Sequence, residues 1–140
     1  MFIDSHCHLN FPELVQRLPD IRREMAQAGV THALLISTKV ETFDEVHGLA
    51  MAHDNFWCTA GVHPDEEGCH EPSEPELLAM GSRAKVVGIG ETGLDYYRMG
   101  ERCHADMAWQ RDRFRMHIRV AQKLRLPLII HTRSASQDTL

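Results

Sequence analysis

Five short apolar segments alternate with segments of helical character, and this alternation constrains the fold more than any other feature. The apolar segments are residues 2–4, 31–38, 55–64, 85–91 and 126–131. Between the first two, residues 11–29 carry Leu14, Leu18, Ile21 and Met25 at spacings of three and four, the period of an amphipathic helix. Short, nearly continuous apolar strands separated by helices predict a parallel sheet that is covered on both faces.

Turn and helix-end residues refine this prediction. Pro19 is expected to begin a second helix within residues 11–29, and Gly29 to end it. Further helices are predicted at 40–53, 76–83 and 105–125, and a long loop at 92–103. The last residues, 132–140, are predicted to form a loop and the start of another helix.

Polar side chains stand where the predicted strands end, and most are of metal-ligating types. They are His6 and His8, Ser37 and Thr38, His63, Glu91, and His131. An open doubly wound sheet would concentrate its chemistry at one switch point and would more often have a glycine-rich phosphate turn, and no GxGxxG occurs. In a (β/α)8 barrel all carboxyl ends meet at one mouth, so the fold class predicted is α/β, of the (β/α)8 TIM-like barrel type.

A complete barrel needs eight strands and roughly 250 residues, whereas this chain offers about five strands in 140 residues. We therefore expect residues 1–140 to form an incomplete barrel domain, the amino-terminal portion of a larger one. The alternative is a half-barrel that self-associates through its open edges.

Composition excludes several classes of protein. The net charge of −5 argues against broad electrostatic capture of nucleic acid or anionic membrane. Four cysteines without a CxxC pair indicate reduced thiols. No signal peptide and no apolar run of about 20 residues is found. A soluble, cytoplasmic protein is expected, with no membrane partner.

The stretch FIDSHCHLN places His6 and His8 two residues apart at the end of the first strand. Side chains two apart in a strand point the same way, with Cα atoms roughly 6–7 Å apart, so two imidazoles can reach one divalent ion. Asp4 has the same parity and can orient an imidazole, while Cys7 should face away from the mouth. Glu91 ends a buried strand, where a carboxylate needs a cation or donors.

The sequence resembles the amino-terminal part of the TatD-type DNases, which are metal-dependent hydrolases on a (β/α)8 barrel. The opening motif is matched by FIDSHCHLN, and GVHP, GIGETGLDYY and PLIIHTRSA match segments on the third, fourth and fifth strands. The resemblance implies two divalent metal ions (Mg²⁺, Mn²⁺ or Zn²⁺), one bound by His6, His8 and Glu91 and one by Glu91 and His131. It makes Glu91 the catalytic residue.

The resemblance also implies that His63, Asp95 and Arg133 line the substrate side, with Arg133 facing a phosphate. Ser134 departs from the acidic residue that commonly follows this arginine. The family takes a further histidine and an aspartate ligand from strands beyond residue 140. The implied activity is 3′ to 5′ exonucleolytic hydrolysis of DNA by a two-metal site.

Two other functions stay open from the residues alone. Amidohydrolase-type enzymes that hydrolyse C–N bonds also begin with HxH on a barrel strand, although many bridge their metals with a modified lysine. A non-catalytic fragment that binds a partner is the other alternative. Three further features are predicted to be unrelated to function: a solvated cationic row on the longest helix, an exposed acidic loop, and isolated histidines in helices or loops. They are Arg111, Arg115, Arg119 and Lys123; residues 65–71; and His47, His53, His104 and His117.

Overall fold

The computed structural model describes all 140 residues and contains one five-stranded sheet, with every neighbouring pair of strands parallel and the strands in chain order. The strands are β1 (Phe2–Cys7), β2 (Val30–Leu35), β3 (Phe56–Ala60), β4 (Val86–Asp95) and β5 (Leu128–Arg133). The helices are α1 (Pro12–Val15), α2 (Leu18–Gln27), η1 (Val40–Thr42), α3 (Phe43–Ala52), α4 (Glu74–Gly81), η2 (His104–Met107), α5 (Ala108–Leu124) and α6 (Ser136–Thr139). The predicted alternation of strands and helices is confirmed.

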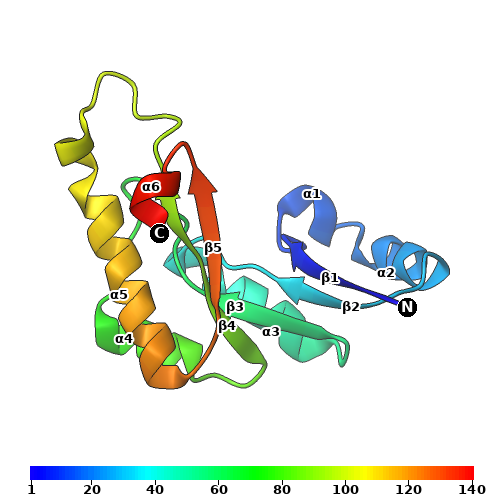
Figure 1. Cartoon of the computed structure of the whole chain (residues 1–140). Coiled ribbons are helices and arrows are strands. Elements are labelled where there is room, and N and C mark those ends of the chain that lie inside the picture. Colours follow the sequence, from blue (N-terminus) through cyan, green and yellow to red (C-terminus); the bar gives the residue numbers. More distant parts are fainter.

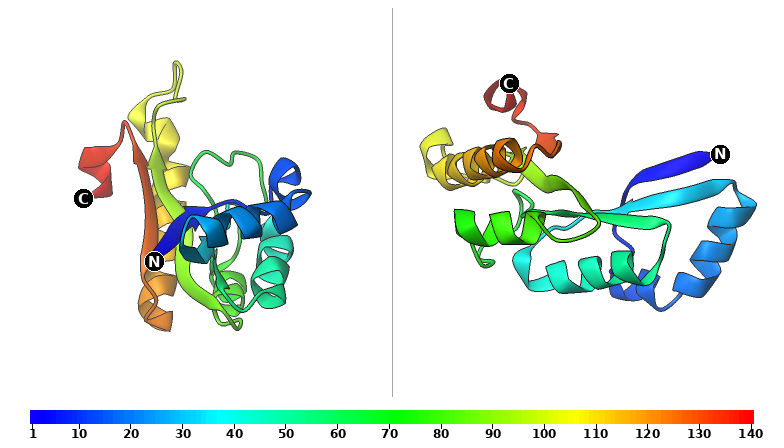
Figure 2. Two further views of the ribbon diagram at one scale, coloured as in Figure 1. Left: turned by 90° about the vertical axis from the view of Figure 1, so that its right-hand side faces the viewer. Right: turned by 90° about the horizontal axis from the view of Figure 1, so that it is seen from below.

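The sheet curls into half of a barrel, with β1 and β5 as its two open edges (Figure 1). Helices α2, α3, α4 and α5 all lie on the outer, convex side of this curl (Figure 2). The predicted barrel-type architecture is therefore confirmed, but the expectation of two covered faces is wrong for these residues. Helices follow the strands on one side only, because each right-handed crossover returns the chain on the same side of the sheet. None of the helices combines the length and apolar character needed to cross a bilayer.

The hydrophobic core lies between the convex face of the sheet and its helices. Leu35, Phe56 and Ile89 point outward from three strands and are fully buried against side chains such as Val46 of α3 and Val120 of α5. Burying each such side chain stabilises the fold by about 1.5–3 kcal/mol. This core fixes the strands, and thereby the positions of the polar residues at their carboxyl ends.

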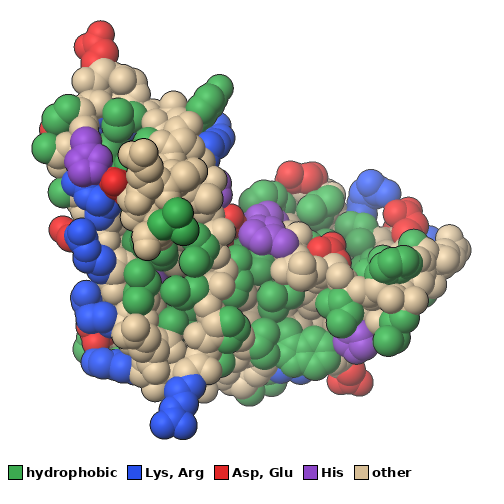
Figure 3. All heavy atoms as spheres, in the orientation of Figure 1, with side chains coloured by type: hydrophobic (Ala, Val, Ile, Leu, Met, Phe, Trp, Pro, Cys, Tyr) green, Lys and Arg blue, Asp and Glu red, His purple; other side chains and the backbone are tan.

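The concave face of the half-barrel exposes apolar side chains instead. Ile3 is 63% exposed. A shallow hollow of about 390 Å³ lies between Ile3, Leu34, Trp57 and Val87. Hydrophobic side chains are visible over the strands in the view of Figure 3. A bare apolar face of this kind is typical of a surface that another element covers.

Strand β4 is longer than predicted and runs through residues 92–95, which were expected to begin a loop. These residues pair with β5, and Gly93 lies opposite His131 and Asp95 opposite Arg133. Gly93 has a φ of +136°, and a Cβ atom at this position would lie 2.0 Å from the carbonyl oxygen of His131. The glycine is needed here because the backbone of β5 approaches so closely.

Helix α4 begins at Glu74, two residues earlier than predicted, because Ser73 caps it. The Ser73 hydroxyl accepts a hydrogen bond from the Glu76 N–H at 3.3 Å, and the Glu76 carboxylate accepts one from the Ser73 N–H at 3.3 Å. This reciprocal pair is a capping box. By contrast, the boundaries predicted from Pro19 and Gly29 are confirmed, since α2 starts around Pro19 and Gly29 follows its end with a φ of +71°.

Replacing Gly93 with alanine tests the close approach of β4 and β5. We expect Gly93→Ala to lower the free energy of unfolding by about 1–3 kcal/mol, because the new methyl group overlaps backbone atoms that cannot move independently. Gly48→Ala is the matched control: this helical glycine has open space around it, and alanine should stabilise the helix by up to about 1 kcal/mol. Urea unfolding followed by circular dichroism measures both, and equal stability of the two variants would contradict the prediction.

Candidate metal centre

Four histidines surround the carboxylate of Glu91 at the carboxyl ends of the strands. Oε2 of Glu91 is 3.2 Å from His6 Nε2 and 4.0 Å from His8 Nε2. Oε1 is 3.3 Å from His131 Nδ1 and 3.9 Å from His63 Nε2. The carboxylate is nearly buried, and its two oxygens face separate pairs of imidazoles. Two groups of three potential ligands therefore share one carboxylate.

Hydrogen bonds fix which ring nitrogens of His8 and His131 face Glu91 with a free lone pair. His8 Nδ1–H donates to the carbonyl oxygen of Ile36 at 3.1 Å, and His131 Nε2–H donates to Asp95 Oδ2 at 2.9 Å. A neutral imidazole has one donor and one acceptor nitrogen, so His8 Nε2 and His131 Nδ1 are the acceptors. Both acceptor nitrogens point toward Glu91. This is the arrangement of a metal-binding histidine, whose other ring nitrogen donates a hydrogen bond that orients the ring.

His63, unlike His8 and His131, turns a protonated ring nitrogen toward the centre. Its Nδ1 accepts a hydrogen bond from the Asp65 N–H at 3.0 Å, so the ring proton is on Nε2. That Nε2–H lies 3.2 Å from the acceptor nitrogen of His131. While the bond from Asp65 holds, His63 offers a donor to the centre rather than a lone pair. A donor at this position suits an oxygen of a substrate better than a cation.

Asp95 and Arg133 form a chain that ends on His131. The carboxylate of Asp95 is fully buried, and Oδ2 also accepts a hydrogen bond from Arg133 Nε at 2.8 Å and forms an ion pair with Nη2 at 2.6 Å. Burial opposes ionisation most strongly, but hydrogen bonds from Arg133, the Tyr97 N–H and His131 outweigh it and hold the pKa of Asp95 below its usual value. Asp95 therefore lies beside His131 as an anion that orients the ring.

Arg133 keeps part of its guanidinium available. Its side chain is 38% exposed, it stacks over the ring of Tyr97 at 4.7 Å, and its contacts with Asp95 use Nε and Nη2. The remaining nitrogen, Nη1, is not used by Asp95. The geometry leaves room for the predicted contact with a phosphate, which stays a prediction.

Cys7 lies between His6 and His8 in sequence but is turned into the core. Its Sγ–H donates to the Leu34 carbonyl oxygen at 3.4 Å, and burial, with a smaller effect of Asp4, raises the pKa of the thiol to about 12. The thiolate form, which binds metals, is therefore suppressed. The orientation predicted from strand parity is confirmed.

Three buried polar residues on α5, missed by the sequence reasoning, position the segment that carries His63. They are Gln110, Arg113 and His117. Gln110 Nε2 donates to the carbonyl oxygens of Pro64 and Asp95 at 2.9 and 3.1 Å. Arg113 Nη1 donates to the His63 carbonyl oxygen at 2.7 Å.

His117 is fully buried rather than an ordinary helical residue, so that expectation is wrong. Its Nδ1–H donates to the Arg113 carbonyl oxygen at 2.9 Å, and its Nε2 accepts the N–H of Val62 at 3.0 Å. The signal was present as polar residues at spacings of three and four on one helix face. The predicted solvated cationic row is confirmed for Arg115, Arg119 and Lys123, and the last two pair with Glu74. Arg111 is an exception, because its side chain is only 15% exposed and donates to Tyr96 Oη and to the His104 carbonyl oxygen.

The acidic loop at 65–71 has exposed residues at its centre, such as Glu67 and His70. It is tied to the rest of the molecule by arginines. Arg113 pairs with Glu71 and donates to the Glu66 carbonyl oxygen at 2.8 Å, and Arg98 donates to Asp65 at 2.9 Å. The loop forms one wall of the mouth.

Comparison with known proteins places this fold in a family. A family model described as "TatD related DNase" matches residues 3–140. The chain belongs to the TatD family. Its TatD fold superposes on the solved structure of YjjV, a TatD homologue of Escherichia coli, with a TM-score of 0.86 at 31% identity, covering 99% of this chain and 53% of that one.

Other TatD relatives carry names that describe chemistry. The uncharacterised metal-dependent hydrolase YcfH of Escherichia coli is 33% identical over 99% of this chain and 51% of the relative. The 3′-5′ ssDNA/RNA exonuclease TatD of Salmonella typhimurium is 29% identical over 98% of this chain and 52% of the relative. The chain therefore spans about half the length of the curated relatives it matches.

Acid should destabilise the protein through His117. Burial lowers the pKa of His117 from 6.5 to about 4, so between these values the unfolded chain binds more protons than the folded one. Stability is then full above pH 6.5 and falls as the pH drops toward 4, by up to about 3 kcal/mol. We expect His117→Gln to flatten this pH dependence of the unfolding free energy, measured by urea denaturation from pH 7 to 4.

His104→Gln, a change at an exposed histidine, is the control for losing a histidine as such. The prediction fails if the His117→Gln variant keeps the pH slope of the wild type.

Proposed function

We propose that the protein is a divalent-metal-dependent phosphodiesterase that hydrolyses DNA from a strand end. One observation carries the proposal. Glu91 is a buried carboxylate whose ion-pair neighbours are all histidines, with neither lysine nor arginine among them. Such a carboxylate needs positive charge to be stable as an anion. Metal ions supply that charge and leave the imidazoles neutral.

In this proposal the two oxygens of Glu91 serve two ions. His6, His8 and Oε2 would hold the first, and His131 with Oε1 would hold the second. The donor set fits because His8 and His131 turn lone pairs toward Glu91 while outer hydrogen bonds hold the rings. Nitrogen and carboxylate ligands suit Zn²⁺ and Mn²⁺, and Mg²⁺ would rely more on water and substrate oxygens.

The chain's own residues would then handle the phosphate in distinct ways. When bound, the ions would activate water and stabilise charge on the phosphate oxygens. Asp95 would keep the His131 ring in the ligating tautomer, and the Nε2–H of His63 would donate to a phosphate oxygen. Arg133 would neutralise a non-bridging oxygen through its free nitrogen. Glu91 is the catalytic residue of the proposal.

The substrate class rests on the family. The TatD of Salmonella typhimurium is named a 3′-5′ ssDNA/RNA exonuclease, which supports a nucleic-acid end over the C–N substrates of amidohydrolase-type enzymes. The acidic chain needs the local charge of the ions to attract DNA. Four free cysteines suit a reducing compartment, and we place the activity in the cytoplasm.

We also propose that residues 1–140 act as the amino-terminal part of a barrel that further strands complete. The bare apolar concave face and the relatives' greater length support this. Self-association of two half-barrels through β1 and β5 is the competing arrangement. Size-exclusion chromatography with light scattering separates the two, because only the second requires a dimer of this chain.

Glu91→Gln tests the metal centre without changing its shape. We expect native mass spectrometry to show Mn²⁺ bound to the wild-type protein and at least one ion lost in the variant, because both sites share this carboxylate. In an assay of nucleotide release from single-stranded DNA, the rate for Glu91→Gln should be roughly 1,000-fold below that of the wild type. Bound ions stabilise the transition state by several kcal/mol.

Glu101→Gln removes the same charge from an exposed loop residue and should change neither measurement. Unchanged Mn²⁺ stoichiometry in Glu91→Gln would refute the assignment of Glu91 as a shared ligand.

A further inference from the structure

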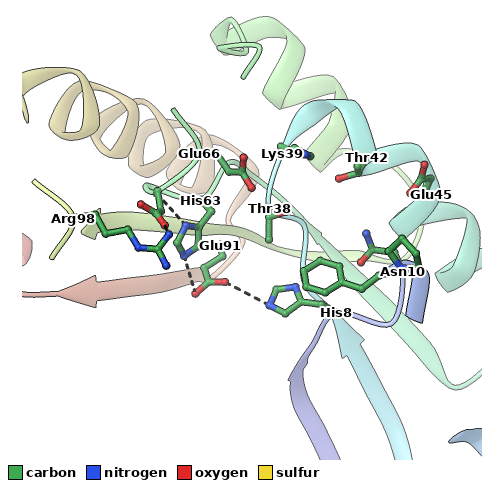
Figure 4. Close-up of a pocket in the computed structure, with 13 residues that line it drawn as sticks. His8, Asn10, Thr38, Lys39, Thr42, Glu45, His63, Glu66, Glu91 and Arg98 are labelled. Carbon is green, nitrogen blue, oxygen red and sulfur yellow. Dashed lines mark hydrogen bonds and ion pairs between the residues drawn. The ribbon is translucent and has the colours of Figure 1, made fainter. Parts of the chain in front are cut away.

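A cavity of about 980 Å³ opens beside the metal centre, and the proposed reaction uses only one end of it. His8, His63 and Glu91 line that end. The other end is lined by residues that follow β1 and β2, namely Asn10, Thr38, Lys39 and Thr42 (Figure 4). Phe11 also lines the cavity. The volume is in the range of small-molecule sites. The second end therefore has room for a ligand group next to the reacting phosphate.

Phe11 presents an aromatic face in this cavity. Its ring stacks on His8 with centroids 5.0 Å apart and an interplanar angle of 11°, and the residue is still 38% exposed. Contact with water does little to stabilise an exposed phenylalanine ring, whereas stacking of a nucleobase on such a ring stabilises binding by about 1–3 kcal/mol. Because His8 is one of the proposed ligands, a base on Phe11 would lie close to a phosphate at the metal centre.

The polar groups around Phe11 lack partners. No hydrogen bond or ion pair joins the side chains of Asn10, Thr38, Lys39 or Thr42 to the other residues drawn in Figure 4. Asn10 is 91% buried, and its Oδ1 has no hydrogen-bond partner. Buried polar atoms are almost always paired in folded proteins. The amide of Asn10 beside an exposed ring is therefore arranged as if to meet a ligand.

The charge of the cavity decides which part of a nucleic acid it accepts. Glu45, Glu66 and Glu91 line it together with Asp65. The cations are Lys39 and Arg98, and Arg98 is already paired with Asp65 at 2.9 Å. Carboxylates therefore outnumber free cations away from the metal centre. A second phosphate would be repelled there, whereas a neutral base and sugar would not.

We propose that this part of the cavity is a subsite for the terminal nucleoside of a single strand, with the base stacked on Phe11. The amide of Asn10, the Lys39 ammonium and the hydroxyls of Thr38 and Thr42 bind polar atoms of the base and sugar. The inference rests on the proposed function, since the phosphate of this nucleoside lies at the metal centre. It adds that the base is held by stacking, so that all four bases are accepted.

The test uses 2-aminopurine deoxyriboside 5′-monophosphate with Mg²⁺ as a fluorescent probe that needs no hydrolysis. Stacking quenches 2-aminopurine, so the wild-type protein should bind the probe with quenching. Phe11→Leu should weaken binding by about 5- to 100-fold and remove the quenching. Phe11→Tyr retains a ring and should keep both. Phe2→Leu, the same change at an exposed phenylalanine at the opposite end of β1, should bind as the wild type does.

Lys39→Gln tests the polar half of the subsite. We expect binding of the probe to weaken about 3- to 10-fold. Arg22→Gln removes a positive charge from the exposed face of α2 and should have no effect. Circular dichroism confirms that each variant is folded.

Native mass spectrometry with Mn²⁺ separates failure of this inference from failure of the proposed function. If the wild type binds neither Mn²⁺ nor the probe, the proposed function fails and the subsite with it. If the wild type binds both and Phe11→Leu binds the probe as tightly with equal quenching, the subsite is refuted while the metal centre stands. Loss of Mn²⁺ in Phe11→Leu would also overturn the proposal, because Phe11 would then act by holding His8.

Discussion

The buried carboxylate of Glu91 is the constraint on which the rest of the site depends. A carboxylate in a protein interior is stable only when positive charge or several donors compensate it. Here the nearby groups are four imidazoles, two on each oxygen. Every strand that contributes one of these rings must end at the same height as Glu91. The curl of the parallel sheet meets this requirement, because it brings the carboxyl ends of β1, β3, β4 and β5 together.

Outer hydrogen bonds then give chemically identical side chains different tasks. The bond to the Ile36 carbonyl makes His8 an acceptor toward the centre, and the bond from the Asp65 N–H makes His63 a donor. Asp95 acts likewise on His131. The tautomers are thus determined by backbone groups and by one buried carboxylate outside the ring of histidines. The positions of the rings alone would not distinguish a histidine that can bind a metal ion from one that can donate a hydrogen bond to a substrate.

Helix α5 supports the site from outside the barrel. Its buried face carries Gln110, Arg113 and His117, which hold the segment after β3 and the end of β4 by hydrogen bonds to backbone atoms. These residues contact none of the four imidazoles with their side chains, so their influence runs through the backbone around His63. On the other side of the same helix, the exposed Arg119 and Lys123 pair with Glu74 of α4. The buried polar residues and the cationic row thus lie on roughly opposite faces of one helix.

The sequence by itself determined the alternation of strands and helices, the helix ends at Pro19 and Gly29, and the presence of metal-ligating types at the strand ends. These are local features, since strand and helix periods and turn residues are set by near neighbours. Only the tertiary structure decided the extension of β4, the tautomer of His63 and the cavity beside Phe11. Each of these depends on residues far apart in the chain, such as Gly93 and His131, whose contact no local pattern encodes. Long-range pairing and burial therefore turned a predicted set of ligand types into a defined site.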